Sequence, residues 1–155
     1  MKTEESLEEL LPQAAPMILL SGCEPERVEN EADAWVDVSP SSPFFDAEVD
    51  GVPGCVALEY MAQSMALAVG FMRRRRGAPP KVGFVLGSRR MSIGIPVFRN
   101  GERYRVKAVC DYQDEAFGSF DCRIEDASGE TVASARMTAF QPEGEIDEKL
   151  LESIQ

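Results

Sequence analysis

The chain has 155 residues, of which 44% are hydrophobic and 28% charged, a length and composition typical of one globular domain rather than a disordered or fibrous chain. It contains no histidine, which excludes a Ser-His-Asp triad, a histidine general base and histidine metal ligands. Its net charge of −11 repels nucleic acid and anionic membranes, so we expect neither as a partner. Residues 1–9, MKTEESLEE, show no signal-peptide pattern, and we expect a cytoplasmic protein.

The four cysteines are predicted to be reduced and to hold no metal. They form no CxxC pair and match no zinc-ligand spacing. In a reducing compartment they are most simply small apolar side chains. These residues are Cys23, Cys55, Cys110 and Cys122.

Period-two alternation of apolar residues predicts a first strand over residues 31–38, EADAWVDV. Further strands are expected over residues 82–95, 103–112, 120–125 and 131–141. Short turns between the last three strands imply an antiparallel meander. The spacing of apolar residues over 146–154 suggests a short amphipathic helix at the C-terminus.

A long apolar helix is predicted over residues 53–72, PGCVALEYMAQSMALAVGFM, which four arginines follow. Proline and glycine at the start and basic residues at the end are typical of helix ends. Because the helix is apolar nearly all round, we expect it to be enclosed on every side by the sheet. Its length also suits a membrane span, but Glu59 and Gln63 would then lie near the bilayer centre, so we expect none.

Glu59 and Gln63 are spaced i, i+4 and share one face of this helix. One interpretation is structural: Glu59 faces a subunit boundary or pairs with Arg89 or Arg90. The other is functional: Glu59 is a general acid or base whose pKa is raised by apolar walls and whose orientation Gln63 fixes. The N–H of Gly54, at the start of the helix, would hold a carbonyl oxygen that gains negative charge.

The sequence resembles the 3-hydroxyacyl-[acyl carrier protein] dehydratases of fatty acid synthesis, and most closely the branch found in aryl-polyene and related lipid clusters. The similar motifs, within residues 7–142, are LPQ and PM near residue 11, PFFD at 43–46, VPG at 52–54, ALEYMAQ at 57–63, GFVLGSRR at 83–90, FGSFDCRIED at 117–126 and FQP at 140–142. The resemblance implies an α+β hotdog fold, an antiparallel sheet wrapped around a central helix, in a single domain over residues 1–155 with acidic tails. It also implies edge-to-edge dimers with active sites at the interface.

By this resemblance Glu59 is the catalytic acid, and Val52, Gly54, Cys55 and Gln63 bind the substrate. The family's catalytic histidine, however, has no counterpart in the stretch 46–52, DAEVDGV, and Gln13 stands where the family has its other histidine. Glutamine neither accepts nor donates a proton usefully at neutral pH. Glu59 would therefore perform both proton transfers, or Asp46, Cys55 or Tyr60 would assist it.

Cys55 adjoins Gly54 at the helix start, where a thiolate is stabilised. It is either a nucleophile or, since no base is available, a packed small side chain. The run Arg73–Arg76 is either a solvated helix end or, together with Arg89 and Arg90, a docking surface for an acidic acyl carrier protein.

Two functions follow. The first is a hydro-lyase, or a related isomerase or thioesterase, that acts through Glu59 on an acyl thioester of acyl carrier protein or coenzyme A. The second is a weakly active or inactive protein that binds the acyl group or completes the sites of an active paralogue. The protein would be a homodimer or a heterodimer with a related hotdog subunit, and no cofactor or metal is expected.

Overall fold

The apolar helix predicted from residue 53 is the central element of the fold. In the computed structural model, which describes residues 6–11, 18–78, 84–114 and 117–140, a 3-10 turn over Gly54–Val56 leads into the helix α2, Ala57–Arg75. The helix extends beyond the predicted residue 72 because arginine is a good helix former. It ends at Arg75. Gly77 follows with a φ of 71°, which suits glycine, and the N–H groups of Gly77 and Ala78 donate to the carbonyls of Arg74 and Arg73.

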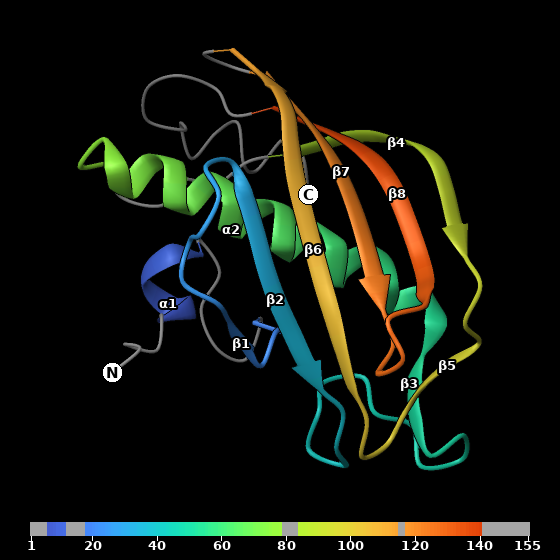
Figure 1. Ribbon diagram of the computed structural model, residues 1–155. Helices are drawn as coiled ribbons and strands as arrows, with labels where there is room; N and C mark the ends of the chain where they lie inside the picture. Colours follow the sequence, from blue (N-terminus) through green and yellow to red (C-terminus); the bar gives the residue numbers. More distant parts are fainter. Residues whose placement is uncertain (1–5, 12–17, 79–83, 115–116, 141–155) are drawn as a thin grey trace, which may run out of the picture.

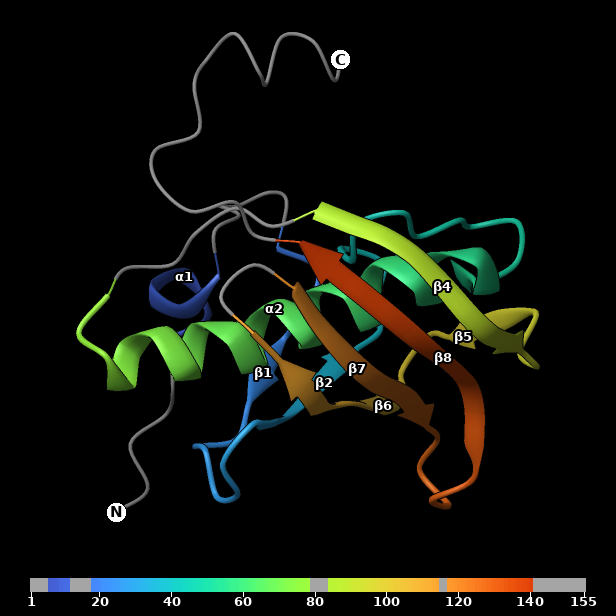
Figure 2. The same ribbon diagram turned by 90° about the horizontal axis from the view of Figure 1, so that it is seen from above.

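A six-stranded antiparallel sheet lies against this helix (Figure 1). Its strand order is β1-β2-β6-β7-β8-β4. The strands are β1 Gly22–Cys23, β2 Glu31–Asp37, β4 Phe84–Ile93, β6 Arg103–Gln113, β7 Phe117–Glu125 and β8 Thr131–Phe140. Figure 2 shows α2 running along one face of the curved sheet. This arrangement confirms the α+β hotdog fold and the meander of the last three strands.

Three short strands and a short helix complete the fold and were not predicted. Besides β1, they are β3, Gly51–Pro53, which pairs with β5, Val97–Arg99, and the helix α1, Leu7–Leu10, which contacts α2. Elements of two to four residues are too short for apolar periodicity to reveal them. The expected C-terminal helix, residues 146–154, and Gln13 lie outside the described residues.

The core lies between α2 and the inner face of the sheet. Alternate residues of β6 and β7 point inward, among them Val106 and Phe120, both fully buried beside Met61 and Leu67 of the helix. The helix is long and apolar enough to cross a membrane, but 67% of its apolar stretch is buried inside the fold. It is the core helix of this domain.

One strip of α2 is open, so the expectation that the helix is enclosed on every side is wrong. Leu58 is 39% exposed, Glu59 is exposed, and Ala62 and Ala66 are half-buried. These four residues, the open strip, recur at spacings of three and four along one helix face. The sheet of a single chain therefore leaves this face uncovered.

Candidate functional site

Glu59 and Gln63 form a polar pair on the helix, and Gln63 also bonds the N-terminal segment. Gln63 is completely buried. Its Oε1 accepts a hydrogen bond of 2.8 Å from the N–H of Leu19, and its Nε2 donates one of 3.4 Å to Oε1 of Glu59. The amide is thereby fixed at both ends, and it holds the adjoining carboxylate on the strip that faces outward.

The carboxylate of Glu59 is exposed in the single chain. No arginine pairs with it among the described residues, so the proposed ion pair with Arg89 or Arg90 is wrong. Glu59 does not line any of the four cavities that the structure gives for its described residues. In the described part of the chain Glu59 is thus open to solvent rather than set in an apolar trough.

The backbone N–H of Gly54 is already engaged in a hydrogen bond within the fold. Its N–H donates to the carbonyl oxygen of Pro96 at 2.8 Å, and a Cβ at this position would overlap the carbonyl of Ile95. Glycine is required here because the backbone of Ile95 and Pro96, just before β5, approaches so closely. The Gly54 N–H therefore does not point into an open site, contrary to the sequence-based expectation.

The next amide along the chain is that of Cys55. Cys55 is exposed. The hydrogen bond at this helix start runs from the N–H of Ala57 to the carbonyl of Gly54, and the N–H of Cys55 takes no part in it. No acceptor for the Cys55 N–H occurs within the described ranges. The first amides of a helix carry partial positive charge and bind anionic oxygens. The backbone N–H of Cys55 is therefore a candidate for the donor role that the sequence predicted for Gly54.

The remaining candidates near the helix start are less suited to contact a substrate. The side chain of Val52 is completely buried, where β3 pairs with β5 opposite Phe98, so it cannot touch a ligand. Asp46 Oδ1 accepts the N–H of Glu48 at 2.9 Å and so stabilises a turn. The stretch 46–52, which replaces the family's histidine segment, is therefore partly ordered by its own hydrogen bonds.

Tyr60 is excluded as a proton donor by its surroundings. The side chain is 1% exposed and packs edge-on against Phe98, with ring centroids 5.2 Å apart. Burial raises the pKa of its hydroxyl to about 12, because the charged form loses its hydration. The group neither reaches the open strip nor ionises near neutral pH.

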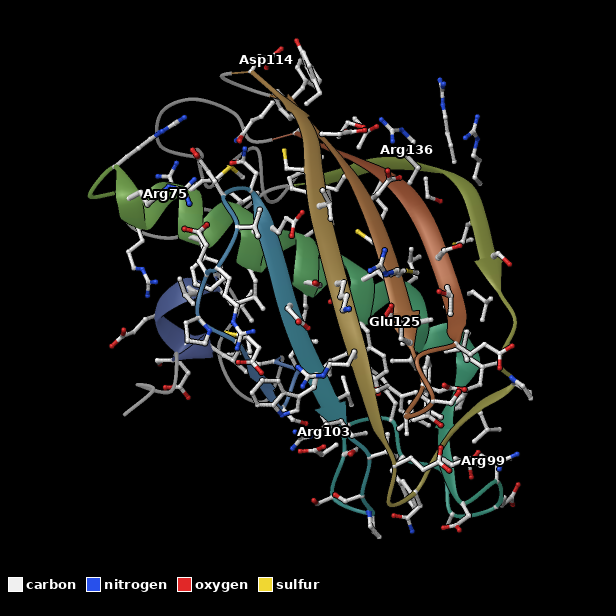
Figure 3. All side chains as sticks on the ribbon, viewed as in Figure 1. Arg75, Arg99, Arg103, Asp114, Glu125 and Arg136 are labelled. Atoms are coloured by element: carbon white, nitrogen blue, oxygen red, sulfur yellow. The ribbon has the colours of Figure 1, made fainter. Side chains whose placement is uncertain are left out.

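The basic residues do not form a single surface. Arg75 pairs with Glu26 and, at 3.5 Å, with Glu29, and Arg74 lies over the ring of Phe71. Arg76 is exposed at the helix end. Figure 3 shows Arg75 at the end of α2 that lies away from β4, the strand that carries Arg89 and Arg90.

Comparison with solved structures assigns this geometry to a known class. The dehydratase heterocomplex ApeI:P from Xenorhabdus doucetiae is similar with a TM-score of 0.84 and 29% identity, covering 99% of both chains. A hypothetical thioesterase with coenzyme A from Streptococcus pneumoniae has a TM-score of 0.61 and 17% identity, covering 80% of this chain and 88% of that one.

The E. coli PaaI protein of the phenylacetic acid degradation operon has a TM-score of 0.58 and 17% identity, covering 77% of this chain and 78% of that one. No curated protein sequence matches significantly. The fold and the helix-borne polar pair thus define a dehydratase-like hotdog protein. A family model described as ApeP-like, ApeP dehydratase, matches residues 5–151. The chain belongs to the ApeP-like dehydratase family.

Proposed function

We propose that Glu59 is the acid–base group of a 3-hydroxyacyl thioester dehydratase whose active site a related hotdog subunit completes. The observation that carries this proposal is the position of Glu59. It lies on the open strip of α2, bonded to Gln63 and one helical turn from the exposed start of the helix at Cys55. A subunit that covers the strip would turn this exposed pair into an enclosed site.

The reaction removes water from the two carbon atoms that follow the thioester carbonyl: a proton from the first and the hydroxyl from the second. Glu59 takes the proton from the carbon beside the carbonyl, whose oxygen gains negative charge and is held by the N–H of Cys55. The carbon–oxygen bond to the 3-hydroxyl then breaks as that group receives a proton and leaves as water. Gln63 orients the Glu59 carboxylate but transfers no proton.

The proton for the leaving hydroxyl needs a second donor or the same carboxylic acid acting twice. The chain contains no histidine, and the Tyr60 hydroxyl, with a pKa of about 12, faces the core. A donor supplied by the second subunit resolves this shortage. The similarity to a chain of a dehydratase heterocomplex supports pairing with a related but different subunit.

A second function is favoured by the same missing histidine. The chain would then be an inactive partner that retains the acyl-binding strip and completes the sites of an active paralogue. In either case the substrate is an acyl thioester of acyl carrier protein or coenzyme A in a polyene or lipid pathway, in the cytoplasm. Gln13 remains the proposed position of the family's other histidine.

The test is hydration of an enoyl-acyl carrier protein, followed as loss of the enoyl absorbance. It is measured with the purified chain alone and mixed with a histidine-containing hotdog dehydratase subunit. We expect Glu59→Gln to lower the rate by about 10²–10⁴-fold, while Glu130→Gln, an exposed turn residue, leaves it unchanged. Activity that survives Glu59→Gln contradicts the acid–base role. If the mixture with the second subunit needs this chain for activity but the Glu59→Gln variant works equally well in it, the result supports the partner function.

A further inference from the structure

The strand β4 forms a long free edge of the sheet. Within the described residues it pairs with β8 alone, and it spans ten residues, Phe84–Ile93, whereas the opposite edge, β1, has two residues. Two apolar side chains of β4 are exposed, Met91 by 48% and Ile93 by 38%. A free edge of this length beside exposed apolar residues is a surface on which another strand pairs.

Two adjacent arginines occupy the middle of this edge. A bulge lies between Arg89, which pairs with Arg136 of β8, and Ser92, and Arg90 within it has a φ of 52°. Both arginines are exposed, and no carboxylate pairs with either among the described residues. A strained backbone at a charged, exposed strand position is costly, which points to a role for these side chains.

The nearby carboxylates on the outer face of the sheet already have a partner. Arg136 pairs with Asp111 and, at 3.2 Å, with Asp121, and Figure 3 shows it on the outer side of β8, next to β4. Arg90 borders a shallow cavity of about 370 Å³ on this face together with Arg136. The positive charge of Arg89 and Arg90 is therefore not compensated by any carboxylate of the described residues.

A second copy of the chain paired along β4 would bring the same two positively charged arginines to this edge. In a two-fold antiparallel pairing of β4 with itself whose axis passes near the bulge between Arg89 and Ser92, the middle of one strand faces the middle of the other. Arg89 and Arg90 of one chain would then lie opposite or diagonal to the same pair of the other chain. Like charges in cross-strand positions destabilise a sheet, and more so where a subunit interface excludes water.

We propose that Arg89 and Arg90 select the occupant of the β4 edge: a hotdog subunit whose facing edge strand carries acidic residues, in preference to a second copy of this chain. This inference rests on the proposed function, in which a related subunit covers the open strip. It gives that subunit a recognisable chemistry, because carboxylates at the centre of its edge strand would pair with both guanidinium groups. It also gives Arg89 and Arg90 a role other than docking a carrier protein.

The charge rule is testable with this chain alone, by making its own complementary partner. The variant Arg89→Glu/Arg90→Glu presents acidic residues where the wild type presents arginines. We expect wild type and variant each to self-associate weakly, and an equimolar mixture to dimerise with a dissociation constant at least tenfold lower than either alone. Sedimentation equilibrium of the two proteins and their mixture, at low salt, measures all three constants.

A neutral variant and a charge control make the result decisive. Arg89→Ser/Arg90→Ser should self-associate more tightly than the wild type, because the repulsion is removed. Arg27→Glu/Arg76→Glu changes the net charge equally at exposed positions away from β4 and should not dimerise with the wild type. A wild-type homodimer as tight as the mixture, or a mixture that stays monomeric, overturns the inference. Neither result bears on Glu59, whose role the hydration assay tests separately.

Discussion

At the scale of single residues, Gln63 is more constrained than the Glu59 carboxylate to which it donates a hydrogen bond. Glu59 is exposed, so its charge is hydrated and costs the fold little. Gln63 is completely buried and satisfies the N–H of Leu19, a backbone donor far away in the sequence. The helix spacing that paired the two residues could be read from the sequence, but the bond to Leu19 could not, because no local pattern links residues 44 positions apart.

Replacing Gln63 should therefore affect both stability and turnover. We expect Gln63→Leu to lower the free energy of unfolding by about 1–3 kcal/mol, because the Leu19 N–H is left buried without an acceptor. It should also lower kcat more than it raises KM, because Glu59 loses its orienting donor. Urea denaturation and the enoyl hydration assay measure the two effects.

A matched control for Gln63 lies one residue further along the helix. Ser64 is also completely buried, and its hydroxyl donates to the carbonyl of Val106 at 3.2 Å, away from Glu59. Ser64→Ala should cost about 0.5–1.5 kcal/mol and leave kcat unchanged. An equal loss of kcat in both variants would show that Gln63 acts only through stability.

At the scale of secondary structure elements, the position of α1 depends on one glycine of α2. Gly70 is buried in the second half of the helix, where a Cβ would overlap the carbonyl of Leu10. Leu10 is 1% exposed and belongs to the core. Glycine in the middle of a helix lowers its stability relative to alanine, and here that cost is offset by the close approach of α1.

Gly70→Ala should accordingly destabilise the fold despite alanine's higher helix propensity. The clash is with backbone atoms, which cannot move aside as a side chain can, so we expect the Tm to fall by several degrees. Gly87→Ala on β4, where nothing lies within 4 Å of the added carbon, is the control and should change the Tm little. A Tm for Gly70→Ala equal to or above the wild-type value would contradict this packing. Differential scanning calorimetry supplies both values.

The long elements could be predicted from the sequence and the short ones could not. The alternation in β2 and β6 and the apolar run of α2 are strong local signals. The segment 82–95 was expected as one strand, yet it ends at Ile93 and a separate strand, β5, follows at Val97, because β5 pairs with β3 rather than continuing along β8. The open strip was missed for a similar reason: apolarity indicates burial but does not tell whether the cover comes from the same chain.

At the scale of the whole molecule, ion pairs neutralise most of the outer face of the sheet. Arg103 bonds Asp37 through Nε and Nη2, at 2.6 and 2.9 Å, and Lys107 lies 3.1 Å from Glu125. Exposed pairs of this kind add little stability, but they cancel the local potential. Among the described residues, exposed arginines without a carboxylate partner therefore lie at three places: Arg76 beyond the end of α2, Arg89 and Arg90 of β4, and Arg99 at the end of β5.

If β4 is covered by a subunit, we propose the end of α2 as the docking surface for an acidic acyl carrier protein. We expect Arg76→Glu to raise the dissociation constant for acyl carrier protein about three- to tenfold at low salt, and the difference to shrink near 1 M salt, where the Debye length is about 3 Å. Arg27→Glu, which makes the same charge change at a side chain that is 63% exposed, is the control for the net charge of −11. Arg75 is less suitable for this test because its replacement would release two carboxylates, Glu26 and Glu29, whereas Arg27 lies 3.6 Å from the Glu24 carboxylate, which also contacts Arg105. Equal affinities for the Arg76 and Arg27 variants by isothermal titration calorimetry would place the carrier protein elsewhere and leave the arginines of the helix end as a solvated terminus.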